Sequence, residues 1–304
     1  MKNPHKKTVI VICGATAVGK TFVAIELAQF FNTEIISADS RQCFKELNIG
    51  VARPSEEELQ LVKHHFIASH SIQEEVNAAV FEHFALQKAD QLFQRHDVIV
   101  MVGGTGLYMK AFCEGMDSIP EIDSSIREDI ISNYEKMGLD WLQQQVKIKD
   151  PLFYQSGEIQ NPQRMMRALE VVESTGQSIL SFHKDNKIKR DFDIIKIGLE
   201  LPKEELLRNI NTRTDKMMED GLSDEVKVLI PHQSLNALQT VGYRELFDHF
   251  NGKVSLADAV EQIKIATRQY AKRQLTWFKK DKTMNWFHPE NIDGMKELIK
   301  REMI

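Results

Sequence analysis

An eight-residue stretch near the start of the chain has the composition of a phosphate-binding loop. It reads Gly14-Ala15-Thr16-Ala17-Val18-Gly19-Lys20-Thr21. Glycines at these two positions allow backbone N–H groups to curl around a di- or triphosphate at a helix N-terminus. The lysine adds a positive charge, and the threonine hydroxyl can reach a bound Mg²⁺. The motif therefore predicts a site for a phosphorylated substrate; the alternative is a tight strand-to-helix turn without a ligand.

Two other polar residues are expected to face this loop. An ATPase normally carries an acid at the end of a buried strand to hold Mg²⁺, but the strand expected at 97–102 ends without one, so ATP hydrolysis is not expected as the main activity. Asp39 follows the strand expected at 34–38, and Thr105 follows the later strand. Ligands of an open α/β sheet lie beyond the carboxyl ends of its strands. Asp39 is therefore a candidate base for a nucleophile near the phosphates, or a turn or capping aspartate. Thr105 is a candidate substrate contact, or a helix cap.

A concentrated run of basic residues lies between Lys264 and Lys282, with seven Lys or Arg residues against one acid. Helical spacing places three polar residues on one face of a helix and four on an adjacent face. The first face carries Lys264, Arg268 and Lys272, and the second carries Gln269, Arg273, Thr276 and Lys280. The aromatic residues Tyr270, Trp277 and Phe278 are interleaved with them. Such a stripe suits a phosphate backbone, and its aromatic side chains would stack on bases or pack in the core. The alternative is a solvated helix face.

The elements that must position these residues alternate between strand and helix over the first hundred residues. Short apolar runs predict buried strands at 8–13, 34–38 and 97–102, and helical periodicity is found at 22–31. Buried strands that alternate with helices indicate a parallel sheet covered on both faces. The expected fold class is therefore α/β, a P-loop NTPase-like core with a parallel sheet flanked by helices.

Strand signals vanish between about residues 119 and 183 and return at 192–201. Helical periodicity fills the gap, at 123–136, 140–147 and 161–174. We therefore expect a core of residues 1–118 and 188–304, interrupted by an all-helical insertion domain at 119–187. The chain after the last expected strand is predicted to be mostly helical.

Composition narrows the class of protein. The 304 residues carry 39 Lys and Arg against 44 Asp and Glu, a net charge of −5, which excludes a generally basic nucleic-acid coat but leaves room for a local basic surface. The three cysteines form no Cys-x-x-Cys pair, so neither a disulfide framework nor a zinc site is expected. No apolar run approaches the roughly 20 residues needed to cross a bilayer, and the first run is too short for a signal peptide. We expect a cytoplasmic protein with no membrane partner.

Taken together, an ordered series of motifs from Val11 to about Trp286 closely resembles the bacterial tRNA dimethylallyltransferases, also called tRNA isopentenylpyrophosphate transferases. The series comprises the phosphate loop and then EIISADSRQ at 34–42, HH at 64–65, VGGTGLY at 102–108, NPQRMMRALEV at 161–171, GLSDEV at 221–226, VGYR at 241–244 and TRQYAKRQLTW at 267–277. Departures are few. Ala15 stands where the family usually has proline, and Pro162 stands where an aspartate is common, which leaves the role of the segment after Asn161 open.

The resemblance implies transfer of a dimethylallyl group from dimethylallyl diphosphate to N6 of adenosine-37, beside the anticodon of tRNAs that read codons starting with U. The products would be N6-(dimethylallyl)adenosine and diphosphate. The resemblance also implies a phosphate loop that holds this diphosphate rather than ATP, Mg²⁺ bound through Thr21, a helical insertion that grips tRNA, and a monomer. Asp39 would accept the N6 proton, Thr105 would contact the base or the donor, and Arg213 would join Lys20 in stabilising the diphosphate.

An adenine in a stacked anticodon loop cannot reach such a pocket, so it is expected to flip out into a channel. The residues that the resemblance implies for holding the anticodon stem-loop are Asp39, Ser40, Arg41, Gln42, Thr105, Arg127, Gln163, Arg164, Met165, Met166, Arg167, Gly242, Tyr243, Arg244, Arg268, Lys272, Arg273 and Lys280.

Three other classes of function remain open at this point. An isopentenyltransferase acting on free AMP, ADP or ATP would share the chemistry but would need neither the basic stripe nor the helical insertion. A small-molecule kinase would hold ATP in the loop and use Asp39 on an acceptor hydroxyl. A non-catalytic RNA-binding module would keep the loop as a relic.

Overall fold

The structure, a computed structural model, describes residues 6–117, 119–120, 122–183 and 188–303. The chain divides into two compact units. The core unit comprises Met1–Glu114 and Lys189–Ile304, and the helical unit comprises Gly115–Ile188.

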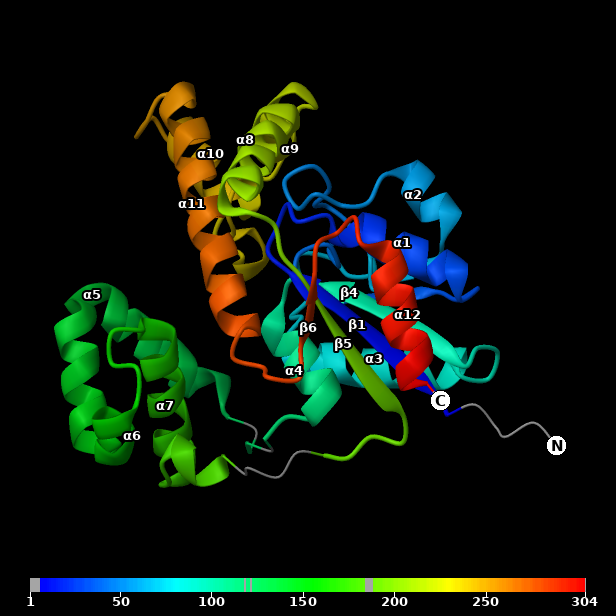
Figure 1. Cartoon of the computed structure of the whole chain (residues 1–304). Coiled ribbons are helices and arrows are strands. Elements are labelled where there is room, and N and C mark those ends of the chain that lie inside the picture. Colours follow the sequence, from blue (N-terminus) through cyan, green and yellow to red (C-terminus); the bar gives the residue numbers. More distant parts are fainter. Residues whose placement is uncertain (1–5, 118, 121, 184–187, 304) are drawn as a thin grey trace. The chain divides into compact units, whose positions relative to one another are not determined.

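The core unit is built on a parallel sheet (Figure 1). Among the described residues its strands are β1 (Thr8–Gly14), β2 (Ile35–Ser37), β3 (His64–His65), β4 (Val98–Gly103), β5 (Asp193–Leu199) and β6 (Asn285–Phe287). Their order in the sheet is β3-β2-β4-β1-β5-β6, and every neighbouring pair is parallel. The central place of β1 puts the loop that follows it in the middle of the carboxyl edge. The predicted α/β fold with a parallel, helix-flanked sheet is confirmed.

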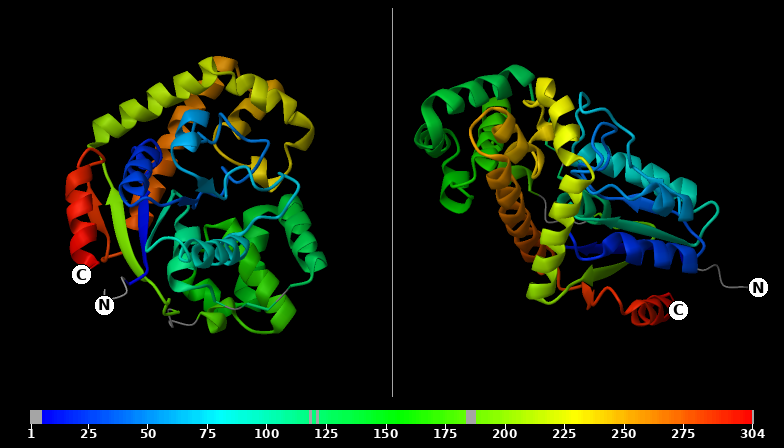
Figure 2. Two further views of the ribbon diagram at one scale, coloured as in Figure 1. Left: turned by 90° about the vertical axis from the view of Figure 1, so that its right-hand side faces the viewer. Right: turned by 90° about the horizontal axis from the view of Figure 1, so that it is seen from above.

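Helices cover both faces of this sheet because β1 is apolar on both of its sides (Figure 2). Successive side chains of a strand point to opposite faces. Val9 and Val11 belong to the cluster that includes helices α3 (Ala78–Leu92) and α4 (Gly106–Glu114). Ile10 and Ile12 belong to the opposite cluster, with α1 (Lys20–Phe30) and α12 (Ile292–Glu302).

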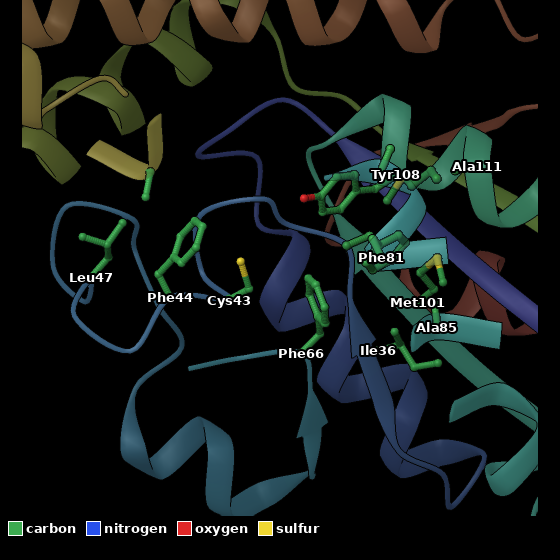
Figure 3. Close-up of a cluster of buried hydrophobic side chains, with 14 of the residues drawn as sticks. Ile36, Cys43, Phe44, Leu47, Phe66, Phe81, Ala85, Met101, Tyr108 and Ala111 are labelled. Atoms are coloured by element: carbon green, nitrogen blue, oxygen red, sulfur yellow. The ribbon is translucent and has the colours of Figure 1, made fainter. Parts of the chain in front are cut away.

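The loop that follows β2 is anchored by its own apolar side chains. Cys43, Phe44 and Leu47 are buried in the same cluster as Phe66 and Phe81 (Figure 3). The rings of Phe66 and Phe81 meet edge to face, with their centroids 5.2 Å apart. The loop is therefore part of the core, although it carries no regular secondary structure for most of its length.

The regular elements of the core unit not yet described are helical. Its remaining α-helices in the described residues are α2 (Glu56–Leu61), α8 (Lys203–Glu219), α9 (Leu222–Val228), α10 (Tyr243–Phe250) and α11 (Leu256–Phe278), with short 3-10 turns η2 (Ile230–His232) and η3 (Asn236–Leu238). The sequence did not predict β3 or β6. These strands have two and three residues and lie at the two edges of the sheet, so neither is long enough to show a period-2 pattern.

The helical unit has a hydrophobic core of its own. It contains α5 (Ser124–Lys149), α6 (Pro151–Ser156), α7 (Pro162–Thr175) and the 3-10 turn η1 (Ile179–Phe182). Two helices were predicted where α5 runs, and α5 is broken inside by Gly138 at φ 76° and ψ −167°. Buried Asp150, which follows α5, links α6 to the start of η1. Its carboxylate accepts hydrogen bonds from the Phe153 amide at 3.0 Å and from the Ser178 hydroxyl at 2.9 Å.

Across the described residues, no helix combines the length and the apolar character that crossing a membrane requires.

Gly103 at the end of β4 offers a test of this packing. A Cβ atom on Gly103 would lie 2.1 Å from the carbonyl oxygen of Ala38, a backbone atom that cannot rotate away. We expect Gly103→Ala to reduce the free energy of unfolding by about 1–3 kcal/mol, measured by urea denaturation. The control is Gly252→Ala, where a Cβ would meet nothing within 4 Å and only the positive φ of 75° opposes the change, at about 1 kcal/mol. A smaller loss at Gly103 than at Gly252 would contradict the argument.

Candidate functional site

The phosphate loop connects the end of β1 to the start of α1. Gly14 has φ 154°, and a Cβ there would lie 2.7 Å from the carbonyl oxygen of Leu199, so only glycine fits. Gly19 caps α1 with φ 96°. Thr21 lies in the first turn of α1, partly exposed, as its predicted role requires.

Lys20 is folded back onto its own loop. Its Nζ donates hydrogen bonds to the carbonyl oxygens of Gly14 at 3.2 Å and Ala15 at 2.7 Å. Burial, together with the positive charge of Arg213, lowers the pKa of Lys20 to about 8, and the charge of Asp39 opposes that shift. Lys20 therefore interacts electrostatically with both Arg213 and Asp39, so the structure brings these three side chains near one another.

Asp39 lies just beyond the end of β2. Its Oδ1 accepts hydrogen bonds from the backbone amides of Arg41 at 2.8 Å and Gln42 at 3.2 Å, which is the turn role considered as an alternative. Within the described residues no hydrogen-bond donor engages Oδ2, so the carboxylate keeps one oxygen available to a substrate. Burial raises the pKa of Tyr270 to about 12, and the nearby charge of Asp39 adds to that rise.

Thr105 joins the ends of β4 and β2. Its hydroxyl accepts a hydrogen bond from the Ser40 amide at 3.0 Å and lies 3.3 Å from the Ser40 hydroxyl. Its backbone amide donates to the carbonyl of Ala38 at 3.2 Å. Thr105 therefore holds the turn that carries Asp39, which places it beside the candidate base.

Arg213 of α8 lines two adjoining cavities. The larger, of about 1180 Å³, is also lined by loop residues 17–19, Arg208 and Lys216. The smaller, of about 130 Å³, is lined by Thr16, Asp39, Arg41, Gly242 and Tyr270 among others. Surrounding protein lowers the pKa of Arg213 by desolvation. A cation thus stands between a cavity bordered by the phosphate loop and a cavity bordered by the carboxylate.

The basic stripe divides between internal contacts and an exposed surface. Lys264 pairs with Asp215 at 2.8 Å, and Arg268 donates to the Asn211 side chain at 2.7 Å. Lys272, Arg273 and Lys280 are exposed. The candidate RNA surface therefore consists of Lys272 and Arg273 on α11 and Lys280 just after it, whereas Arg268 is bonded inside the protein.

Gln274, which the sequence analysis gave no role, lies on the inner side of α11. It is buried, accepts a hydrogen bond from the Thr16 amide at 2.8 Å and donates to the Gly104 carbonyl at 2.9 Å. A Cβ on Gly104 would lie 2.3 Å from its Nε2. The close approach of α11 thus explains this glycine.

Three of the predicted tRNA contacts need correction because their side chains are buried. Met165 and Met166 are 0% and 5% exposed in the core of the helical unit. Tyr243 is 0% exposed, and its hydroxyl donates to Glu225 at 2.5 Å. These side chains pack inside the protein instead of facing an RNA ligand.

The other predicted contacts in the helical unit lie at its surface. Arg127 and Gln163 are exposed, as is Arg164, which pairs with Glu158 at 2.7 Å. Arg167 is partly exposed and pairs with Glu170 at 3.0 Å. Asn161 caps α7 by accepting from the Arg164 amide, and Pro162 occupies the first turn, where proline is favoured.

The remaining predicted contacts lie in the core unit. Ser40 and Arg41 are partly exposed, and Gln42 donates its side-chain amide to the carbonyls of Val51 and Ala52 at 3.2 Å and 2.8 Å. Gly242 caps α10 with φ 96° and borders the smaller cavity. Arg244, on α10, is exposed.

The residues present fit a Mg²⁺ ion only together with a phosphorylated ligand. No group of three or more His, Cys, Asp or Glu residues in the described part of the chain could hold a metal. Mg²⁺ is commonly held by few protein oxygens, several waters and substrate phosphates. The Thr21 hydroxyl at the phosphate loop suits that mode.

A phosphate loop after the central strand of a parallel sheet, with a lysine, a carboxylate and an arginine gathered beyond it, defines a P-loop-type enzyme. The family model described as IPP transferase matches residues 42–281. The tRNA dimethylallyltransferase of Flavobacterium johnsoniae is 47% identical over 287 residues, which cover 92% of this chain and 93% of the relative. That of Christiangramia forsetii is 47% identical over 293 residues, or 96% and 97% of the two chains.

Solved structures agree with these relatives. The tRNA isopentenylpyrophosphate transferase of Bacillus halodurans has a TM-score of 0.73 and 31% identity, over 98% of this chain and 97% of that one. A eukaryotic dimethylallyltransferase described as acting on tRNA has a TM-score of 0.74 and 29% identity, over 89% and 69%. The chain therefore belongs to the IPP transferase family, and it is a prenyl-transferring enzyme.

Proposed function

We propose that this enzyme transfers a dimethylallyl group from dimethylallyl diphosphate to N6 of adenosine-37 in tRNAs that read codons starting with U. The observation that carries the proposal is the gathering of Lys20, Arg213 and Asp39, with cations beside the phosphate loop and a carboxylate beside the adjoining cavity. Relatives named tRNA dimethylallyltransferase support it over a kinase or a free-nucleotide transferase. With tRNA as acceptor, we place the reaction in the cytoplasm, and we propose that the enzyme acts as a monomer.

In the proposed reaction the N6 nitrogen attacks C1 of the donor. The new bond is N6–C1, the bond that breaks joins C1 to the diphosphate oxygen, and diphosphate leaves with both electrons. The proton lost from N6 passes to Asp39, whose Oδ2 is available while Oδ1 holds the turn. Thr105 keeps that turn in place through Ser40.

Diphosphate gains negative charge as it leaves, so cations fixed in advance lower the barrier. Lys20, Arg213 and the loop amides are the groups placed to do this. Thr21 is the residue that would hold Mg²⁺, and the ion would supply further charge stabilisation. Two of the three N–H groups of Lys20 are bonded to the Gly14 and Ala15 carbonyls, which leaves the third for a donor oxygen.

The tRNA would be held by surfaces on both units. In the core unit these are Lys272 and Arg273 of α11, Lys280 just after that helix, and Arg244 of α10. In the helical unit they are the exposed side chains of Arg127, Gln163 and Arg164. Their charges suit a phosphate backbone, and binding should weaken as salt rises.

The test of the proposed function combines purified protein, Mg²⁺, dimethylallyl diphosphate and unmodified tRNA with adenines at positions 36–38. The RNA is digested and analysed by mass spectrometry for N6-(dimethylallyl)adenosine, with AMP as a parallel acceptor. Product on tRNA alone is expected. Product on AMP alone would instead identify a free-nucleotide transferase, and phosphorylation of a small molecule by ATP would favour a kinase.

The lowered pKa of Lys20 predicts how diphosphate binding depends on pH. Above about pH 8 the free enzyme loses the Lys20 proton, so binding of inorganic diphosphate should weaken, approaching tenfold per pH unit. Isothermal titration calorimetry between pH 7 and pH 9.5 would measure this dependence. Above about pH 8, binding of diphosphate should be accompanied by uptake of a proton by Lys20. Lys20→Met should bind more weakly at pH 7 and lose this part of the pH dependence. An unchanged pH profile in that variant would assign the effect to another group.

A further inference from the structure

The segment at residues 48–53 borders both cavities of the site. Asn48, Ile49, Ala52 and Arg53 line the larger cavity, and residues 50–52 line the smaller one. The segment lies outside any helix or strand, so contacts with other elements must fix its shape.

Glu225 of α9 supplies those contacts. One carboxylate oxygen, Oε2, accepts hydrogen bonds from the amides of Asn48 at 3.1 Å and Ile49 at 2.8 Å. The other, Oε1, accepts from the amide of Gly50 at 3.1 Å and from the Tyr243 hydroxyl at 2.5 Å. A single carboxylate therefore binds three consecutive backbone N–H groups, and charged acceptors form stronger hydrogen bonds than neutral ones.

Tyr243 packs against the same segment. A Cβ on Gly50 would lie 2.6 Å from the Tyr243 ring, so the backbone of the segment packs directly against that ring. Burial and the adjacent Glu225 carboxylate both raise the pKa of Tyr243, which keeps its hydroxyl protonated as a donor. The segment is thus held by hydrogen bonds to the amides of Asn48, Ile49 and Gly50, and by close packing of Gly50 against the Tyr243 ring.

A second set of bonds leads from this segment to the candidate base. The side-chain amide of Gln42 donates to the carbonyls of Val51 and Ala52, and the backbone amide of Gln42 donates to Asp39 Oδ1. Arg53 closes the segment by donating to the carbonyls of Phe44, Lys45 and Leu47. Glu225 is therefore linked to Asp39 by hydrogen bonds to residues 48–50, by the backbone to residues 51–52, and by the hydrogen bonds of Gln42.

We propose that Glu225 is a positioning residue for prenyl transfer, holding residues 48–50 so that Gln42 stays in place and keeps Asp39 at the smaller cavity. This inference rests on the proposed function. Glu225 lines neither cavity, so it acts only through the segment it binds.

Glu225→Gln tests the proposal because the amide keeps the shape but can no longer accept all four hydrogen bonds. The matched control is Glu82→Gln, which breaks the pairing of Glu82 with Arg190 at 2.7 Å and does not border either cavity. We expect kcat for tRNA prenylation to fall about 10- to 100-fold in Glu225→Gln, since small displacements of reacting groups have effects of this size. The KM for tRNA should stay within about threefold, because the exposed cations are untouched.

Glu225→Asp retains the negative charge and should recover part of the lost kcat. If Glu225→Gln keeps the kcat of the Glu82→Gln control, or if Glu225→Asp recovers none of the loss, the positioning role is overturned. If Glu225→Gln does not fold, Tyr243→Phe removes one hydrogen bond and leaves the carboxylate, and it should lower kcat in the same direction by a smaller factor. An unchanged kcat in that variant would likewise count against the proposal.

Amide hydrogen exchange separates this inference from the proposed function. In Glu225→Gln, peptides covering residues 39–42 and 44–54 should exchange faster than in the parent, and peptides from β1 should be unchanged. This result does not depend on which reaction the enzyme performs. A parent that fails to prenylate tRNA would remove the proposed function alone, whereas unchanged exchange at residues 39–42 would remove the link between Glu225 and Asp39.

Discussion

Asp39→Asn is expected to lower kcat for tRNA prenylation by about 10²- to 10⁴-fold, the usual contribution of a positioned general base. The asparagine side chain retains an oxygen that accepts from the Arg41 and Gln42 amides, so the turn should survive. The change therefore removes the proton acceptor and little else. Steady-state kinetics with saturating donor would measure the loss.

Binding of tRNA provides the control for this variant. Because the exposed basic side chains are unaltered, the dissociation constant for unmodified tRNA should stay within about threefold. Asp39→Ala, which removes the turn as well, should be no more active than Asp39→Asn. A kcat within about threefold of the parent in Asp39→Asn would exclude Asp39 as the base.

Arg213→Gln is expected to lower kcat by about 10²- to 10³-fold, because it removes a fixed charge from the position of the leaving diphosphate. Arg208→Gln is the matched control: it changes the same residue type on the same helix but borders only the larger cavity. We expect that variant to lose less than about tenfold. Equal losses in the two variants would indicate a general effect of cavity charge.

The same variant should also alter the titration of Lys20. The positive charge of Arg213 is one cause of the lowered Lys20 pKa, so its removal should raise that pKa from about 8 toward its ordinary value. The pH above which inorganic diphosphate binding weakens should therefore rise in Arg213→Gln. An unmoved midpoint would mean that burial alone sets the Lys20 pKa.

The parts of the site that are local in sequence were the parts that the sequence could predict. The phosphate loop is one uninterrupted stretch between a strand and a helix, and only Ala38 separates Asp39 from its strand. Gln274 and Glu225 received no role because their partners are distant: the Thr16 amide lies 258 residues from Gln274, and the Asn48 amide lies 177 residues from Glu225. Contacts of this kind depend on how helices dock.

Three residues predicted to contact tRNA are buried, although they belong to motifs that are local in sequence. Met165 and Met166 stand beside exposed Gln163 and Arg164 in one motif, but a helix turns about 100° per residue, so neighbours face different surroundings. Tyr243 lies between Gly242, which borders a cavity, and exposed Arg244. A motif identifies a segment, and only the packed helix decides which of its side chains reach a ligand.

The central place of β1 has a consequence for biosynthesis. As the ribosome releases the chain, β1 can pair with β4 once Gly103 has emerged, but its other edge stays open until β5 ends at Leu199. The whole helical unit, with its own hydrophobic core, is made in between. At about 5–20 residues per second the wait lasts roughly 5–20 s. The nascent enzyme therefore carries an unpaired apolar strand edge throughout this interval, when it is most in need of chaperone protection.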